Sequence, residues 1–163
     1  MAGHMRGKVP SDWLSPALKS MDTSNADALA VFREHAVTAA TDVSGFGLLG
    51  HLGEMLRASR LGAELHVKAV PVFPGALEVL HNGIESSLQT NNEMALQDFV
   101  LRGCGIDDPR VRVLVDPQTS GGLLASVPAD RGEACLAALH EHGYEQAALI
   151  GEVSAEGWIV QGG

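Results

Sequence analysis

The sequence predicts an α+β fold in which helices pack on a mixed β-sheet. Strand-like stretches follow one another directly at 111–127 and at 147–160, and helical patterns adjoin one another at 13–35 and at 77–101. A doubly wound fold would instead alternate strands with helices along the chain. The order of the elements therefore favours the α+β class.

Helices are expected where apolar residues recur three or four positions apart, and caps, prolines and glycines mark their ends. Ser15 and Pro16 are expected to start the first helix, and Asn25 is expected to cap the second. The expected helices cover 13–21, 25–35, a segment that ends at about 60, 77–80, 94–101 and 128–142.

Strands are expected where β-branched residues cluster or apolar residues alternate. The expected strands cover 36–41, 63–67, 111–115, 123–127, 147–153 and 158–160. Between them, the stretch 81–92 is polar and has no apolar period, which is typical of a loop that binds something or moves. In this stretch, Asn91 and Asn92 fit either turn formation or contact with a ligand.

The length of 163 residues, 45% of them hydrophobic, is sufficient for one buried core. Met1 to Met5 resemble the remnant of an expression tag, and the polar residues after them, with Pro10, fit a linker. We therefore expect residues 1–12 to lie outside the fold and one domain to span 13–163.

The formal net charge of −9 and the isoelectric point of about 5.1 provide no electrostatic footprint for nucleic acid or an anionic membrane. Phosphates could bind such a surface through a divalent metal. The sequence has no apolar run of membrane-spanning length and no visible signal peptide. Cys104 and Cys135 lack the spacing of a zinc site, so a reduced, cytoplasmic protein is expected.

The most unusual stretch is Thr41-Asp42-Val43-Ser44-Gly45-Phe46-Gly47-Leu48-Leu49-Gly50-His51, which we call the first motif. A strand is expected before it and a helix after it, so Asp42, Gly45 and Gly47 fall at a strand-to-helix turn. Such a turn directs free backbone N–H groups and the positive end of a helix dipole toward an anion such as phosphate.

Two side chains of the first motif have alternative interpretations. Asp42 either caps the turn or supplies one carboxylate of a Mg²⁺ site, and the three glycines after it favour the metal role. His51 either reaches toward Asp42 or forms a structural hydrogen bond. The glycines also match the dinucleotide fingerprint G-x-G-x-x-G, with Glu64 near the position of a ribose-binding acid. However, Glu64 precedes the apolar part of its strand, and no further βαβ units follow.

The second motif is Asp116-Pro117-Gln118-Thr119-Ser120-Gly121-Gly122, which is expected to connect two strands tightly. The two glycines permit close backbone approach or a positive φ. Thr119 and Ser120 are candidate phosphate contacts, although hydroxyl groups in turns also bond their own backbone. Asp116 either acts in the site or opens the turn together with Pro117.

The two motifs together resemble the signature stretches of the selenophosphate synthetase family, also called selenide, water dikinase. Ile150-Gly151-Glu152-Val153 also resembles that family. The similarity begins near Trp13 and covers the C-terminal half of the family's protein. The wider superfamily, which includes aminoimidazole ribonucleotide synthetase, shares the architecture but has different sequences at these turns.

The resemblance implies a C-terminal α+β domain of the aminoimidazole ribonucleotide synthetase-like type, packed on an N-terminal ATP-binding domain that this chain lacks. The family makes selenophosphate from selenide and ATP with Mg²⁺ and releases AMP and phosphate, and the full-length protein is expected to be a homodimer. Asp42 matches a family aspartate that holds Mg²⁺ together with acids of the N-terminal half. Ser44 stands where the family more often has threonine.

The residues expected near the phosphates are Gly45, Gly47, Thr119, Ser120 and Gly121. The family's reactive cysteine or selenocysteine and its nearby lysine belong to the absent half, so we expect no catalytic residue in this chain and no activity from it alone. A docking module of the same fold, without catalysis, is the alternative function.

Overall fold

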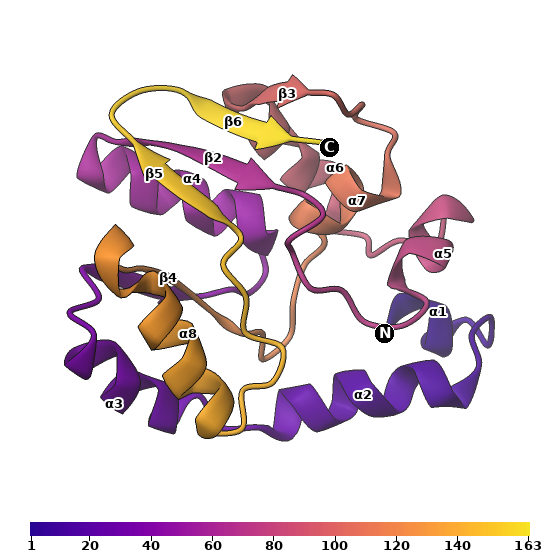
Figure 1. Ribbon diagram of the computed structural model, residues 1–163. Helices are drawn as coiled ribbons and strands as arrows, with labels where there is room; N and C mark the ends of the chain where they lie inside the picture. Colours follow the sequence, from indigo (N-terminus) through magenta and orange to yellow (C-terminus); the bar gives the residue numbers. More distant parts are fainter.

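The computed structural model describes residues 1–163 and has the expected α+β class, with helices around two separate β-sheets (Figure 1). The helices are α1 (Ala2–Met5), α2 (Ser11–Asp22), α3 (Ala26–Glu34), α4 (Gly47–Ser59), α5 (Ala76–His81), α6 (Gln89–Asn92), α7 (Pro109–Arg112) and α8 (Gly132–Glu141). The strands are β1 (Ala39–Asp42), β2 (Gly62–His66), β3 (Val100–Arg102), β4 (Leu123–Ser126), β5 (Gly151–Ser154) and β6 (Trp158–Gln161). The 3₁₀ helices are η1 (Glu93–Asp98), η2 (Val113–Val115) and η3 (Ala129–Arg131).

The larger sheet is mixed and has the strand order β3-β6-β2-β5. β6 runs parallel to both β2 and β3, whereas β5 is antiparallel to β2. β1 and β4 form a separate antiparallel pair in which Asp42 lies opposite Leu123. The expectation of one mixed sheet therefore holds for four strands only.

The dinucleotide interpretation is wrong, because the strands before and after α4 belong to different sheets. A dinucleotide-binding βαβ unit requires the strands on both sides of its helix to be parallel members of one sheet. Here β1 and β2 flank α4 but belong to different sheets. Glu64 lies in the middle of β2, opposite Glu152, rather than at a strand end.

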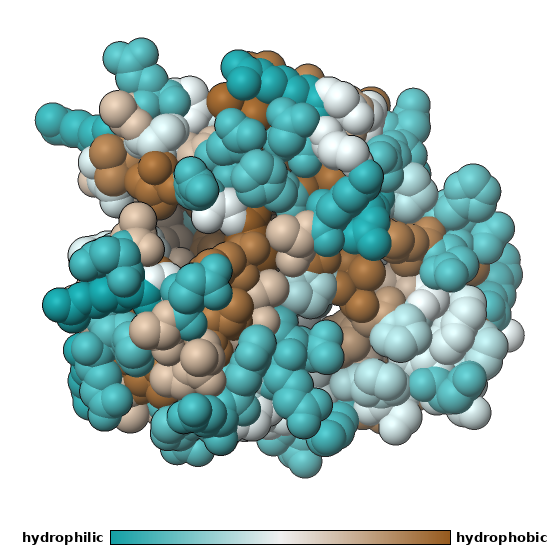
Figure 2. All heavy atoms as spheres, viewed as in Figure 1, coloured by the Kyte–Doolittle hydropathy of each residue, from teal (hydrophilic) through white to brown (hydrophobic).

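The hydrophobic core has two parts, and β4 contributes to both. Leu124 belongs to the larger cluster, which also contains Leu49 of α4 and Val160 of β6. Leu123 and Ala125, on the other face of β4, pack against the smaller cluster formed by α3 and α8. Figure 2 shows a hollow between these two parts of the molecule, with hydrophobic residues inside it. The β1–β4 pair therefore lies between two packing units.

The prediction of a strand at 111–115 is wrong, because this segment forms the end of α7 and all of η2. Pro109 occupies the start of α7, and the Asp108 carboxylate accepts a hydrogen bond from the Arg110 N–H at 2.8 Å. The fully buried residues Val111, Leu114 and Val115 follow helical spacing. The second motif therefore connects a 3₁₀ helix to a strand and does not join two strands.

The helix expected at 94–101 is also only partly correct, because η1 ends at Asp98 and β3 follows it. The polar stretch 81–92 contains α6, and the side chain of Gln89 is fully buried there. This segment is therefore not an open loop, although most of its residues are exposed, because α6 anchors it through Gln89.

The helix starts expected near the N-terminus need correction too. α2 begins after Pro10, so Ser15 is not its cap and Pro16 lies inside the helix. Asn25 occupies the N-cap position of α3, but its side chain makes no capping hydrogen bond. The hydroxyl of Ser24 accepts the Ala26 N–H instead, at 3.1 Å. None of the helices combines the length and apolar character needed to span a bilayer.

We predict that Leu49→Ala lowers the free energy of unfolding by about 2 to 5 kcal/mol, because it leaves a cavity in the larger cluster. Leu49 is completely buried, whereas Leu29 on α3 is 46% exposed. Leu29→Ala should therefore cost less than about 1 kcal/mol. Urea unfolding of the two variants measures the difference, and equal costs would contradict this assignment of the core.

Candidate functional site

Asp42 and the first glycines lie at the turn between β1 and α4, as expected. Asp42 is the last residue of β1; its side chain is exposed and has no hydrogen-bond or ion-pair partner. Gly47 begins α4 with a φ of 68°, and a Cβ there would lie 2.7 Å from the carbonyl carbon of Val115. At Gly45 a Cβ would meet no atom within 4 Å, so its backbone is open to an approaching group.

The two motifs bond directly to each other, and we call residues 42–47 the first glycine loop and residues 116–122 the second. The Gln118 N–H donates to the Ser44 carbonyl at 3.0 Å, and the Val43 N–H donates to the Gly122 carbonyl at 2.9 Å. A Cβ at Gly121 would lie 2.2 Å from the Val43 carbonyl oxygen, a distance that no side chain can tolerate. The two loops therefore form one continuous surface.

His51 does not reach Asp42 but holds the first glycine loop. It lies in α4 with only 7% of its surface exposed, and its Nε2 accepts the Ser44 N–H at 3.1 Å. Nε2 is therefore unprotonated, and the proton of the neutral ring is on Nδ1, which lies 3.4 Å from a Glu54 carboxylate oxygen. This arrangement agrees with the structural interpretation of His51.

The hydroxyl groups of the second glycine loop differ in what they contact. The Ser120 Oγ donates to the Met21 carbonyl at 2.9 Å, so this donor is already used, and Ser120 has a φ of 50°. Thr119 is exposed and its hydroxyl makes no hydrogen bond. The Asn25 amide donates to the Gly121 carbonyl at 3.2 Å, a contact that no local sequence pattern indicates. The second loop is thus anchored to the end of α2 and to the start of α3.

Asp116 is half-buried at the start of the second loop and faces its own turn. The Gln118 amide donates to the Asp116 carboxylate at 3.0 Å and to the Asp116 carbonyl at 3.1 Å. Burial raises the pKa of the Asp116 carboxyl above its ordinary value, and the hydrogen bond from Gln118 opposes this shift. The contacts match the turn-forming interpretation of Asp116.

The structure has no group of three or more histidine, cysteine, aspartate or glutamate side chains that could hold a metal ion, so Asp42 does not belong to such a group. Its free carboxylate fits a Mg²⁺ ion that takes one or two protein carboxylates and completes its shell with water and phosphate oxygens. Beside the first glycine loop, Phe46 and Gly50 line an open pocket of about 200 Å³, with Asn91 and Asp98 on its other side.

Comparisons with known proteins place these features in context. A family model described as "AIR synthase related protein, C-terminal domain" matches residues 18–160. A Pelobacter propionicus protein named selenide, water dikinase is 39% identical over 150 residues, which are 92% of this chain and 43% of that protein. Proteins of the same name from Porphyromonas gingivalis and Myxococcus xanthus are 35% and 38% identical over 152 residues, and 43% of each is covered.

A solved structure, thiamine-monophosphate kinase from Stenotrophomonas maltophilia, aligns with a TM-score of 0.47 and 22% sequence identity. The alignment covers 79% of this chain and 32% of that protein. The chain therefore spans less than half the length of the relatives named above.

We predict that Gly47→Ala lowers the free energy of unfolding by at least about 2 kcal/mol, through the cost of positive φ and the clash with Val115. Gly45→Ala is the matched control within the same loop, and it should change stability by no more than about 0.5 kcal/mol. Thermal and urea unfolding of both variants would measure this contrast, and a tolerated Gly47→Ala would contradict the described contact between Gly47 and Val115.

We predict that Asp116→Asn changes how stability depends on pH. The pKa of the Asp116 carboxyl is higher in the folded protein than in the unfolded chain. As pH rises between these two pKa values, the folded protein keeps a proton that the unfolded chain has released, so the stability of the wild type falls. The asparagine variant lacks this loss, so its stability relative to wild type should increase between about pH 4 and pH 7. Urea unfolding across this pH range measures the difference, and the exposed Asp107→Asn is the control. A constant difference in stability between Asp116→Asn and the wild type would contradict the prediction.

Proposed function

Because this chain belongs to the family of AIR synthase related protein C-terminal domains, we propose that it forms the C-terminal part of a selenide, water dikinase. The proposed reaction is Mg²⁺-dependent and uses ATP and selenide to make selenophosphate, with release of AMP and phosphate. The names of the relatives and their similarity along almost the whole chain support this proposal. The remainder of those relatives would correspond to an N-terminal ATP-binding domain.

The observation on which the proposal rests most directly is the surface that the two glycine loops form beside Asp42. The carboxylate of Asp42 is exposed and unpaired, which suits a ligand of Mg²⁺ on the phosphates. When bound, the metal would neutralise phosphate charge. A helix leaves backbone N–H groups free in its first turn, so an anion beside the start of α4 would be stabilised.

The other candidate residues differ in what they can offer to a phosphate. Gly45 leaves its backbone accessible, whereas Gly47 and Gly121 permit the close packing that shapes the loops. Thr119 has a free hydroxyl group, whereas the hydroxyl proton of Ser120 is bonded to Met21. We therefore propose Thr119 as the side-chain donor of the second loop, and a backbone role for Ser120.

Phosphoryl transfer requires positioning and charge neutralisation from more than one side of the phosphates. This chain contributes one free carboxylate and two loops, so we propose that the remaining metal ligands and the reactive residues come from the N-terminal domain. The chain alone should then be folded but inactive. The two free cysteines, Cys104 and Cys135, are consistent with a cytoplasmic setting.

We predict that Asp42→Asn in the full-length protein reduces selenide-dependent AMP formation by about 100-fold or more, since even residues that only support a metal ligand contribute 10- to 100-fold. Stability should change by less than about 0.5 kcal/mol, because the side chain is exposed and unpaired. Exposed Asp107→Asn serves as the control and should retain activity.

The two possible failures of this experiment have different meanings. If the wild-type protein forms no AMP from ATP and selenide, the proposed enzyme function is wrong, and a non-catalytic docking role replaces it. If the wild-type protein is active and Asp42→Asn retains that activity, the metal role of Asp42 is wrong, while the enzyme function stands.

A further inference from the structure

The geometry points to Asn92 as a positioning residue for the proposed Mg²⁺·ATP site, an inference that rests on the proposed function. Asn92 is the last residue of α6 and belongs to neither glycine loop. Its amide nitrogen donates to the Gly45 carbonyl at 2.8 Å and to the Val115 carbonyl at 3.0 Å. One side chain therefore uses both of its N–H donors to join two segments that are far apart in the sequence.

The two carbonyl groups that accept from Asn92 belong to the backbone of the first glycine loop and to the residue before the second. Gly45 is at the centre of the first glycine loop, and Val115 directly precedes Asp116, where the second loop begins. The backbone of Val115 also lies against Gly47. Asn92 thus links the first glycine loop to the residue that enters the second, in addition to the direct bond between Ser44 and Gln118. We infer that its amide sets the spacing of the groups that would surround the phosphates.

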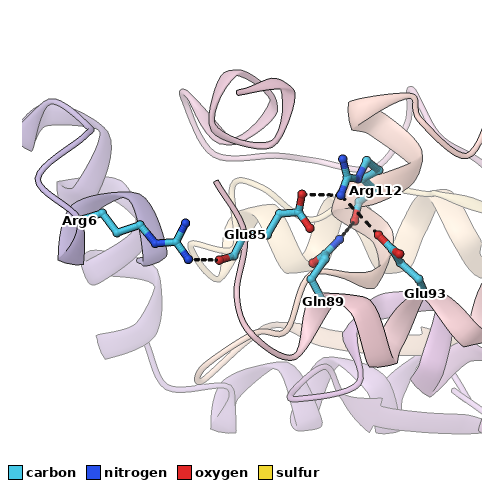
Figure 3. Close-up of polar contacts among 5 residues, drawn as sticks. All are labelled: Arg6, Glu85, Gln89, Glu93 and Arg112. Carbon is cyan, nitrogen blue, oxygen red and sulfur yellow. Dashed lines mark hydrogen bonds and ion pairs between the residues drawn. The ribbon is translucent and has the colours of Figure 1, made fainter. Parts of the chain in front are cut away.

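Asn92 can act in this way because α6 and the residues on either side of it in the sequence bond to Arg112, the last residue of α7. Figure 3 shows the contacts: the guanidinium of Arg112 pairs with the carboxylates of Glu85 and Glu93, on either side of α6. The amide nitrogen of Gln89, a side chain without exposed surface, donates to the Arg112 carbonyl at 2.9 Å. A shift of α6 would break the bond of Gln89 and strain the two partly buried ion pairs of Arg112, so these contacts hold Asn92 in position.

The same contacts connect α6 to the segment that enters the second loop. Arg112 is the last residue of α7, and η2 follows it directly and ends at Val115. Gln89 therefore holds the beginning of this short segment and Asn92 holds its end. The polar stretch that the sequence predicts to be an open loop is instead the support on which both glycine loops are aligned.

The test replaces Asn92 in the full-length protein with aspartate, which has the same shape but lacks both N–H donors, and with alanine, which adds no charge. Gln97→Glu is the control, because it makes the same amide-to-acid change in η1 at an exposed side chain without hydrogen bonds. The loss of two hydrogen bonds should raise KM for Mg²⁺·ATP about tenfold in both Asn92 variants, with kcat changed less than about threefold. Gln97→Glu should match wild type.

A purely structural role would give a different result, because fewer molecules would be folded. In that case kcat would fall while KM stayed unchanged, and the inference would be overturned. Wild-type kinetics in both Asn92 variants would overturn it as well.

A second measurement does not depend on activity. The amide hydrogens of Gly47 and Gln118 both bond to the Ser44 carbonyl. Hydrogen exchange at Gln118 therefore reports on the contact between the loops, and exchange at Gly47 reports on the first loop itself. Both Asn92 variants should exchange these amides at least about tenfold faster than wild type and Gln97→Glu. If wild type forms no AMP but exchange accelerates as expected, the proposed function fails and Asn92 still aligns the loops. Unchanged exchange would refute the role of Asn92 in either case.

Discussion

The close backbone contact between the two glycine loops is the constraint on which the arrangement of this protein depends. Gly121 packs on the Val43 carbonyl at a distance that excludes any side chain, and two backbone hydrogen bonds flank this contact. The strand pair β1–β4 runs directly into it, and α4 begins immediately after it. The position of α4 over the larger sheet is therefore linked to the loop geometry, and residues that serve the proposed site also determine the fold.

The β1–β4 pair has a second role, because its two faces belong to different parts of the core. Leu124 contacts the cluster beneath the larger sheet, whereas Leu123 contacts the cluster between α3 and α8. The hollow visible in Figure 2 separates these clusters on one side of the molecule. With only one short strand pair between two packing units, the free carboxylate of Asp42 lies at the end of the element that joins them.

The sequence predicts well those features that depend on local pattern. The α+β class, the turn from β1 to α4 and the strand after the second motif follow from periodicity and glycine placement. The valines at 111–115 mislead because alternating and helical spacing both fit so short a run, and only burial of Val111, Leu114 and Val115 decides for the helix. Side-chain contacts over long sequence distances, such as Asn25 with Gly121 or Asn92 with Gly45, have no local signature at all. The ligands of the proposed site stay predictions, made from the glycine turns together with the resemblance.

The anchoring of the second glycine loop to the N-terminal part of the chain has a mechanical consequence. Ser120 bonds the carbonyl of Met21, near the end of α2, and Asn25 bonds Gly121 from the start of α3. α2 extends along one edge of the molecule from α1 toward α3 and has no buried residue (Figure 1). A displacement of α2 along its axis must either break these bonds or pull the loop with it. Because Gly122 in that loop accepts the Val43 N–H, a movement of the loop would reach the backbone next to Asp42.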